Sequence, residues 1–294
     1  MNGFRHLQRS DIDAARWDAC VEASPRARIY GTSLFLDRMA DEWDGIVLDD
    51  YRAVLPLPRR RKYGIDYLCP MPFSGALAVY GKEPLPCDTL DVLQQIPARF
   101  RLWDINLDVQ GRDLPWHTTA RNNHVLPLDH PYAELSAGFR ETLRQTLGQE
   151  REHGFARAGI SIDKLLEEAL AAGALAGTSP SDRLRLKRLY QDLGVREKAF
   201  TLGWVEEGRT VAGALFFRSP GRIYYMAAWS GEEGRKCGAA ARLLDTVIRE
   251  YAGMDAVLDF EGSDIPGVAF FFEGFGAKPE SYLLVKRRRF PFLS

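Results

Sequence analysis

The segment Arg235-Lys236-Cys237-Gly238-Ala239-Ala240 combines residue types that suit the binding of a phosphate. It stands at the start of a strongly periodic helical pattern, and a helix N-terminus offers unpaired N–H groups and the positive end of a dipole. Gly238 lets the backbone approach a ligand closely, and Arg235 and Lys236 add positive charge. Ordinary solvated helix starts carry the same residues, so both interpretations stay open.

Two basic runs, residues 59–62 and 286–289, are a second candidate for recognising an anion. The first run follows Pro56 and Pro58, and it could face a phosphorylated acceptor. The alternative, which we favour, is that alternate residues of an exposed strand are simply solvated. No RNP-like aromatic motif accompanies either run, which lowers the case for RNA binding.

Several other chemistries are excluded by pattern. The chain has no GxxxxGK[ST], no GxGxxG after a strand and no GxSxG. Its histidines show neither HxxxH nor HExxH spacing, so we expect no metal site. The cysteines (Cys20, Cys69, Cys87 and Cys237) form no CxxC pair, and we expect reduced, mostly buried thiols.

The composition is that of a globular protein. The 294 residues are 46% hydrophobic and 27% charged, and this length favours two domains or one large one. The net charge of −1 argues against a dedicated nucleic-acid coat protein. The longest apolar stretch, residues 169–177, is about half a membrane span, and no signal peptide is visible at the start. We expect a soluble, cytoplasmic protein.

The second half of the chain must position the phosphate segment. Alternating and turn residues predict four strands, at 202–205, 210–217, 222–229 and 256–260. Between the last two strands lies an amphipathic helix that ends at Gly253. Its apolar positions are Ala240, Leu243, Leu244, Val247, Ile248 and Tyr251.

The first half repeats this order more loosely. Strands are expected at 46–48, 51–58, 65–69 and 102–107. The stretch Trp103-Asp104-Ile105-Asn106 aligns with Leu258-Asp259-Phe260-Glu261. Two similar αβ units explain this economically, with chance alignment of short strands as the alternative. We place the units at 1–130 and 131–294, with helices at 139–150, 162–170 and 184–193 at the start of the second.

The order strand, hairpin, strand, glycine-containing turn, helix and strand resembles the acyl-CoA N-acyltransferase (GNAT) fold. In that fold a loop of pattern [QR]xxGx[GA] binds the pyrophosphate of acyl-CoA, and residues 235–240 fit it. The resemblance implies an acyl-CoA co-substrate, with acetyl-CoA expected. The donor-binding residues would be Trp229, Ser230, Arg235, Lys236, Gly238, Ala239 and Ala240.

The C-terminal segment resembles the FemAB-like and BioF2-like acyltransferases, which pair two GNAT-like units in one chain. The shared pattern consists of Asp259, Phe260, Gly262, Gly267, Phe271, Phe272, Phe275, Gly276 and Ala277. Residues 17–37 and 43–65 are similar to the first unit of a bacterial branch of that group. The resemblance implies an α/β fold of two tandem GNAT-like units, each a mixed central sheet flanked by helices.

Two departures from the family pattern concern the chemistry. Phe270-Phe271-Phe272 stands where typical GNAT enzymes place a tyrosine general acid, and Ser263 and Tyr282 are the nearest hydroxyls. Ser74-Gly75-Ala76 follows Pro72-Phe73, where the related branch has polar residues.

The resemblance also implies roles around the reacting carbonyl. Backbone N–H groups near residues 227–230 would polarise the thioester, and Glu261 is the candidate base. A solvated loop carboxylate is the alternative for Glu261, with Asp264 and Glu232 behind it. Asp259 is expected to hold the backbone near the strand end, and Trp229 to form a wall.

We therefore expect acyl transfer from acyl-CoA to a small-molecule amine. The two prolines of Pro70-Met71-Pro72-Phe73 in the first unit remove N–H donors, so this turn suits an apolar wall better than a phosphate cradle. Arg59, Tyr63 and Phe73 are accordingly predicted on the acceptor side. The alternatives are FemAB-like aminoacyl transfer from tRNA to a cell-wall precursor, and a degenerate GNAT-like binding module. We expect no membrane partner and no nucleic acid beyond tRNA; the oligomeric state stays open.

Overall fold

The computed structural model describes residues 3–109, 114–149, 154–261 and 264–288. The chain divides into two compact units. Unit 1 comprises Met1–Arg121 and Ser281–Ser294, and unit 2 comprises Asn122–Glu280. The sequence predicted one boundary at 130/131, so the structure differs in two ways. The division falls nine residues earlier, and the C-terminal stretch returns to unit 1.

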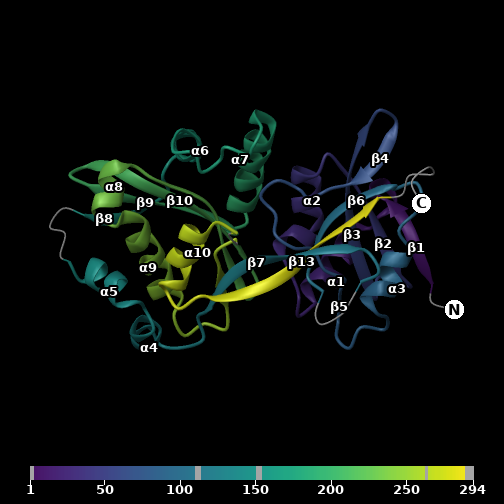
Figure 1. The fold of residues 1–294 in the computed structure, drawn as a ribbon, viewed down its shortest axis with the longest axis horizontal. Helices are drawn as coiled ribbons and strands as arrows, with labels where there is room; N and C mark the ends of the chain where they lie inside the picture. Colours follow the sequence, from purple (N-terminus) through teal and green to yellow (C-terminus); the bar gives the residue numbers. More distant parts are fainter. Residues whose placement is uncertain (1–2, 110–113, 150–153, 262–263, 289–294) are drawn as a thin grey trace. The chain divides into compact units, whose positions relative to one another are not determined.

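Unit 1 is an α/β unit around one mixed sheet (Figure 1). Its strands follow the spatial order β1-β2-β3-β4-β6-β13, with β5 paired to β3. The β4–β6 pair is parallel, and the other pairs within the unit are antiparallel. The elements are β1 (Phe4–Gln8), α1 (Ala14–Glu22), α2 (Ser33–Met39), β2 (Glu42–Leu48), β3 (Ala53–Lys62), β4 (Ile65–Leu68), β5 (Tyr80–Gly81), α3 (Thr89–Gln94), β6 (Leu102–Leu107) and the later part of β13 (Lys278–Arg288).

Unit 2 has the strand order β7-β12-β11-β10-β9-β8. The β11–β12 pair is parallel, and its neighbours are antiparallel. The elements are β7 (His117–Pro127), which begins in unit 1, α4 (Tyr132–Ala137), α5 (Glu141–Gly148), β8 (Phe155–Ala158), α6 (Ile162–Ala171), α7 (Pro180–Gly194), β9 (Ala199–Glu206), β10 (Arg209–Ser219), β11 (Arg222–Ser230), α8 (Glu232–Lys236), α9 (Ala239–Tyr251), β12 (Val257–Asp259) and α10 (Pro266–Glu273).

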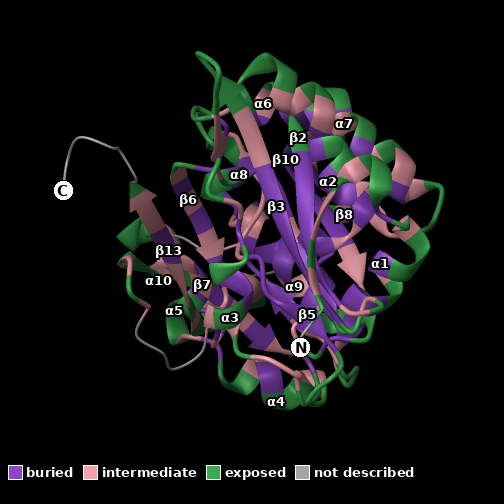
Figure 2. Ribbon diagram, turned by 90° about the vertical axis from the view of Figure 1, so that its right-hand side faces the viewer, coloured by how far each residue is buried: buried purple, intermediate pink, exposed green. Residues whose placement is uncertain are grey.

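Each sheet forms the buried centre of its unit. Strands β3 and β10 are buried over most of their lengths (Figure 2). In unit 2, helix α9 inserts Leu244, Val247 and Ile248 into a core that also contains Phe216 and Phe272. The i, i+3, i+4 spacing of these α9 residues creates the buried stripe, as the sequence predicted.

The helix expected at 139–150 corresponds to α5, which begins at Glu141 and ends at Gly148, and the apolar residues that precede it form a separate helix, α4. Gly138 ends α4, and Arg140 takes an extended conformation as the N-cap of α5. The Arg140 N–H donates to the carbonyl of Gly274 at 2.8 Å rather than to the preceding helical turn. A tertiary hydrogen bond therefore divides a segment whose apolar spacing is continuous, and residue 150 lies outside the described part of the chain.

All four cysteines are free in the structure. Cys20 and Cys237 are buried, and Cys69 and Cys87 are partly exposed. Burial raises the pKa of the Cys20 thiol to about 11. Burial also dominates at Cys69 and raises its pKa to about 11. These thiols are therefore protonated near neutral pH, which fits a structural role.

Candidate active site

Strands β11 and β12 separate after a short parallel pairing. Arg222, Ile223 and Tyr224 pair with Val257, Leu258 and Asp259. The chain then leaves β11, and the Phe260 N–H donates to the carbonyl of His124 in β7. Strand β11 continues to Ser230 beside β10. Within the described chain, no strand pairs with the β12 side of β11 over residues 225–230. An open strand edge presents N–H and C=O groups that an extended ligand can pair with.

A bulge lies at the point where the two strands separate. Phe216 is opposite Tyr225, whereas Leu215 is opposite Ala227, so Met226 is the additional residue in β11. A bulge bends its strand and changes where the following side chains point. Tyr225, just before the bulge, and Ala228, after it, pack against the core that includes α9. Trp229 lies on the other face, beside Gly213.

Trp229 is buried and Ser230 is partly buried, and each has a buried polar atom without a partner in the described structure. Trp229 is 7% exposed, yet its indole Nε1 has no hydrogen-bond partner in the described structure. The buried Ser230 Oγ has none either. Buried polar atoms are nearly always hydrogen-bonded, and an unsatisfied one costs about 1–3 kcal/mol. The open end of β11 therefore has polar atoms that suit a ligand or water, and it includes two of the predicted donor residues.

The predicted phosphate segment is helical rather than an open loop. Gly231 begins α8, whose first turn contains Glu232 and Glu233, residues that favour a helix start. The N–H groups of Arg235, Cys237 and Gly238 donate to backbone carbonyls at 2.9–3.2 Å. They are therefore already engaged. The N–H groups left to face an anion are those of the first α9 turn, where Ala239 is buried and Ala240 is partly exposed.

The two cations of this segment are exposed. The Arg235 guanidinium donates to the Ser230 carbonyl at 2.8 Å, next to the open end of β11. The Lys236 ammonium pairs with Glu232 at 2.7 Å. Exposed surface pairs of this kind are weak and break readily for a better anion. Both side chains are therefore available to an anion near the start of α8 and α9.

Gly238 has a left-handed backbone conformation, with φ of 66°. A Cβ there would lie 2.4 Å from Thr146 Cγ2 of α5, so helix α5 closes one side of the glycine. Arg242 fixes this contact, because its guanidinium donates to the carbonyls of Cys237, Thr146 and Gln149. The glycine is therefore required by packing as well as by its backbone angle.

Glu261, the predicted base, directly follows the end of β12. It is partly buried and has φ of 61°, which is uncommon for a residue with a side chain. Its N–H donates to Asp259 Oδ1 at 2.9 Å. Asp259 therefore holds this turn, as expected from the sequence. Strained backbone of this type often lies at functional sites.

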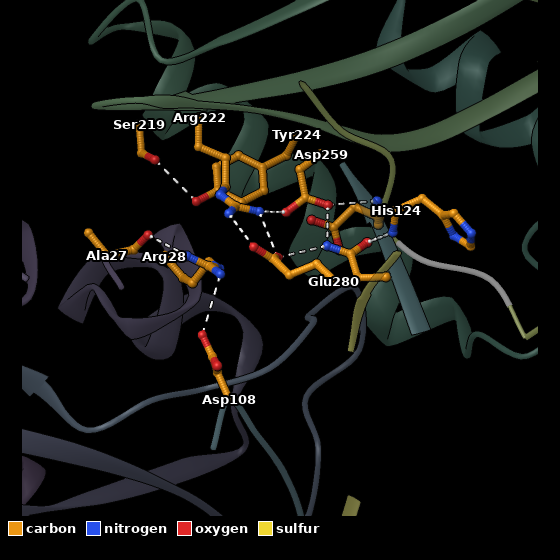
Figure 3. Close-up of polar contacts among 11 residues, drawn as sticks. Ala27, Arg28, Asp108, His124, Ser219, Arg222, Tyr224, Asp259 and Glu280 are labelled. Carbon is orange, nitrogen blue, oxygen red and sulfur yellow. Dashed lines mark hydrogen bonds and ion pairs between the residues drawn. The ribbon is translucent and has the colours of Figure 1, made fainter. Parts of the chain in front are cut away.

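Asp259 belongs to a buried polar network shown in Figure 3. It accepts hydrogen bonds from Arg222 and from Asn123 Nδ2 at 2.8 Å. Arg222 also donates to Glu280 at 3.0 Å. Burial by itself lowers the pKa of Arg222, but Asp259 and Glu280 outweigh it and raise the pKa above its usual value. The guanidinium therefore stays charged and anchors the turn that carries Glu261.

The predicted acceptor residues lie in unit 1 and are separated from one another. Arg59 on β3 is bound to Asp44 at 3.0 Å and to Glu42 at 2.6 Å. Tyr63 is at the tip of the β3–β4 hairpin and is 92% exposed. Phe73 is partly buried in the segment after β4, with φ of 54°. A shared acceptor role for these three stays a prediction.

Two residues of this region were not identified from the sequence. Tyr225 lies where β11 and β12 separate, and His124 on β7 is buried with its Nδ1 unpartnered in the described structure. Both rings lie 6.2 Å from Phe272 of α10. Residues 117–127 are mostly polar and do not alternate with apolar ones, so the sequence carries no clear signal for β7. The described residues contain no group of three or more metal-ligating side chains suited to an ion. No helix in the described ranges has the length and apolar character needed to cross a bilayer.

No protein-family model and no curated protein sequence matches the chain with significance. Solved structures match it at low identity over nearly the whole length. FemX is 12% identical with a TM-score of 0.69, covering 96% of this chain and 97% of FemX. A tandem GNAT protein from the clavulanic acid pathway is 13% identical with a TM-score of 0.51, covering 97% and 98%. The C-terminal domain of a putative lysylphosphatidylglycerol synthetase from Agrobacterium fabrum is 12% identical with a TM-score of 0.52, covering 93% and 90%.

Likeness at this identity concerns the fold. Coverage of both chains in each comparison means that the paired-unit architecture is shared, rather than one unit alone. The chain has an α/β fold of two tandem GNAT-like units, and it shares this fold with the tandem GNAT protein and its overall similarity with FemX. This confirms, at the level of the fold, the resemblance to the FemAB-like group.

Proposed function

We propose that the protein is an N-acyltransferase that moves an acyl group from acyl-CoA, with acetyl-CoA the expected donor, to a small-molecule amine. The observation that carries this proposal is the open edge of β11 over residues 225–230. A CoA thioester carries a chain of amide groups that pairs well with a strand edge. The unpartnered Trp229 Nε1 and Ser230 Oγ lie at the same end.

Each residue then has a defined role. The N–H groups of β11 polarise the thioester carbonyl as its oxygen gains charge. Arg235 and Lys236 attract the phosphates, and the first turn of α9 favours an anion nearby. Glu261 removes a proton from the attacking amine. The amide forms as the carbon–sulfur bond breaks, and CoA leaves as the thiol.

Donor binding provides the first test. Calorimetric titration of the intact protein with acetyl-CoA should give a Kd in the micromolar to millimolar range. Changing both Arg235 and Lys236 to Ala should weaken binding by about tenfold or more, because a charge-assisted hydrogen bond contributes about 1.5–3 kcal/mol. Arg249→Ala is the matched control, since Arg249 is an exposed cation at the far end of α9. No heat from the folded wild type would reject the acyl-CoA proposal.

A degenerate binding module is the second candidate, and one observation favours it. The N–H groups of Cys237 and Gly238, expected to be free for phosphate, donate to the carbonyls of Glu233 and Arg235. A folded wild type that binds no acyl-CoA would support this candidate. The tRNA-dependent alternative predicts aminoacyl transfer from charged tRNA with no acetyl-CoA turnover. The cytoplasmic location stays a prediction.

A further inference from the structure

Tyr225 is the first residue of β11 beyond its pairing with β12. It immediately precedes the bulge at Met226 and is opposite Phe216, with ring centroids 5.5 Å apart. Phe272 of α10 meets the Tyr225 ring edge-on at 6.2 Å. The side chain is partly exposed, and its hydroxyl has no hydrogen-bond partner in the part of the chain that the structure describes. A phenol among apolar rings thus lies at the start of the open strand edge.

A phenol in such surroundings normally finds a polar partner. Because the side chain is partly exposed, water or a ligand can supply the hydrogen bond that the described residues do not. Burial raises the pKa of Tyr225 above its usual value of 10.0. Its proton is therefore retained throughout the neutral range. The hydroxyl can act as a hydrogen-bond donor or acid, and it is not suited to act as a base.

Other groups near the strand separation are less suited to donate a proton. Phe272, which α10 directs at this point, has no proton to give. Ser230 has an aliphatic hydroxyl, a much weaker acid than a phenol, at the far end of the open edge. The His124 ring also lies 6.2 Å from Phe272, but His124 is on β7, and β12 lies between β7 and β11 in the sheet.

We propose that Tyr225 is the catalytic proton donor to the leaving group of the acyl transfer. This inference rests on the proposed acyl-CoA reaction. The amine nitrogen forms a bond to the thioester carbon, and the carbon–sulfur bond breaks with its electron pair on sulfur. The Tyr225 hydroxyl protonates that sulfur, giving the thiol. The proton released by the amine returns through water to the phenolate, so protons and electrons balance.

The test compares Tyr225→Phe with Tyr224→Phe. Tyr224 is the neighbouring buried tyrosine, and its hydroxyl lies 3.1 Å from Ser219 Oγ within the protein. Both substitutions remove a single oxygen. Two acyl donors are used with lysine, spermidine and glucosamine as amines. Acetyl-CoA needs a proton on its departing sulfur, whereas 4-nitrophenyl acetate has an acidic leaving group that departs without one.

Tyr225→Phe should lower acetyl-CoA turnover by about 100-fold or more, the usual contribution of a general acid. Its Kd for acetyl-CoA and its rate with 4-nitrophenyl acetate should stay within about threefold of wild type, and Tyr224→Phe should retain both activities. Unchanged acetyl-CoA turnover in Tyr225→Phe overturns the assignment and leaves the proposed function intact. Equal losses with both donors also overturn it. A wild type that neither binds nor turns over acetyl-CoA refutes the proposed function, and this inference with it.

Discussion

Gly238 and Thr146 should be energetically coupled. Gly238 has φ of 66°, and an added Cβ would lie 2.4 Å from Thr146 Cγ2. Carbon atoms normally approach to about 3.5–4.0 Å, so Gly238→Ala introduces a severe overlap. Thr146→Ser removes only Cγ2 and retains the hydroxyl that donates to Thr142 at 2.9 Å. The nearest remaining atom to the new methyl is then Thr146 Cβ at 3.9 Å, an ordinary contact.

The structure allows the cost of Gly238→Ala to be divided. The left-handed backbone costs about 1–2 kcal/mol for a residue with a Cβ, and overpacking adds about 1–3 kcal/mol. Gly253→Ala measures the backbone cost alone, because Gly253 has φ of 82° and its added Cβ would meet nothing within 4 Å. Thr146→Ser alone should cost about 0.5 kcal/mol, since the partly exposed methyl loses less than a fully buried one.

Denaturant unfolding of the intact protein measures all four variants. The double variant Thr146→Ser/Gly238→Ala should be more stable than Gly238→Ala alone, with a coupling free energy of about 1 kcal/mol or more. If the losses of unfolding free energy in the two single variants add up to the loss in the double variant within about 0.5 kcal/mol, the close packing of α5 against Gly238 is refuted. Valine is unsuitable for testing donor binding at Gly238, because a β-branched residue is strongly disfavoured at positive φ. The double variant places a methyl at Gly238 without the overlap and is the better probe.

Buried thiols, a buried ion pair and the two sets of predicted site residues lead to further measurable outcomes. The pKa of Cys20 and of Cys69 rises from about 9 in the unfolded chain to about 11 in the folded protein. Their contribution to the free energy of unfolding is therefore complete below pH 9 and is lost between pH 9 and 11. The urea midpoints at pH 8 and pH 10.5 should differ less in the variant that carries both Cys20→Ser and Cys69→Ser than in the wild type. Asp259→Asn should lower the free energy of unfolding by about 2–3 kcal/mol. This is less than the loss from breaking an isolated buried ion pair, because Glu280 still binds Arg222. An unchanged urea midpoint would contradict this prediction. Phe73→Ala should leave acetyl-CoA affinity intact and lower turnover, whereas Arg235→Ala should weaken affinity; equal effects on affinity would reject an acceptor role for Phe73.

The strands and the main helix of unit 2 were predictable because their signals are local. The turn at residues 206–209 and the alternation on either side identify β9 and β10. The spacing of apolar residues identifies α9, which the structure places at Ala239–Tyr251. Each signal depends on neighbours within one or two turns, so the tertiary environment did not alter it.

Features that depend on distant residues were not predictable in the same way. The break between α4 and α5 depends on Arg140 bonding to Gly274, more than 130 positions along the chain. The assignment of Ser281–Ser294 to unit 1 depends on β13 pairing with β6. Helix α8 was missed for a different reason, because a helix of five residues has too few turns to show a period.

The location of Tyr225 shows why a site can be recognised in part from a sequence. Trp229, Ser230 and Arg235 were identifiable because the strand end and the following helix start are adjacent in the chain. The exposure of Tyr225 to a ligand depends on three further facts: the end of β12 at Asp259, the bulge at Met226, and the placement of Phe272. In sequence, Tyr225 is one aromatic residue within an aromatic strand. The sheet register gives it a distinct chemical position, since the strands separate at this residue. Its hydroxyl has no partner among the residues that the structure describes.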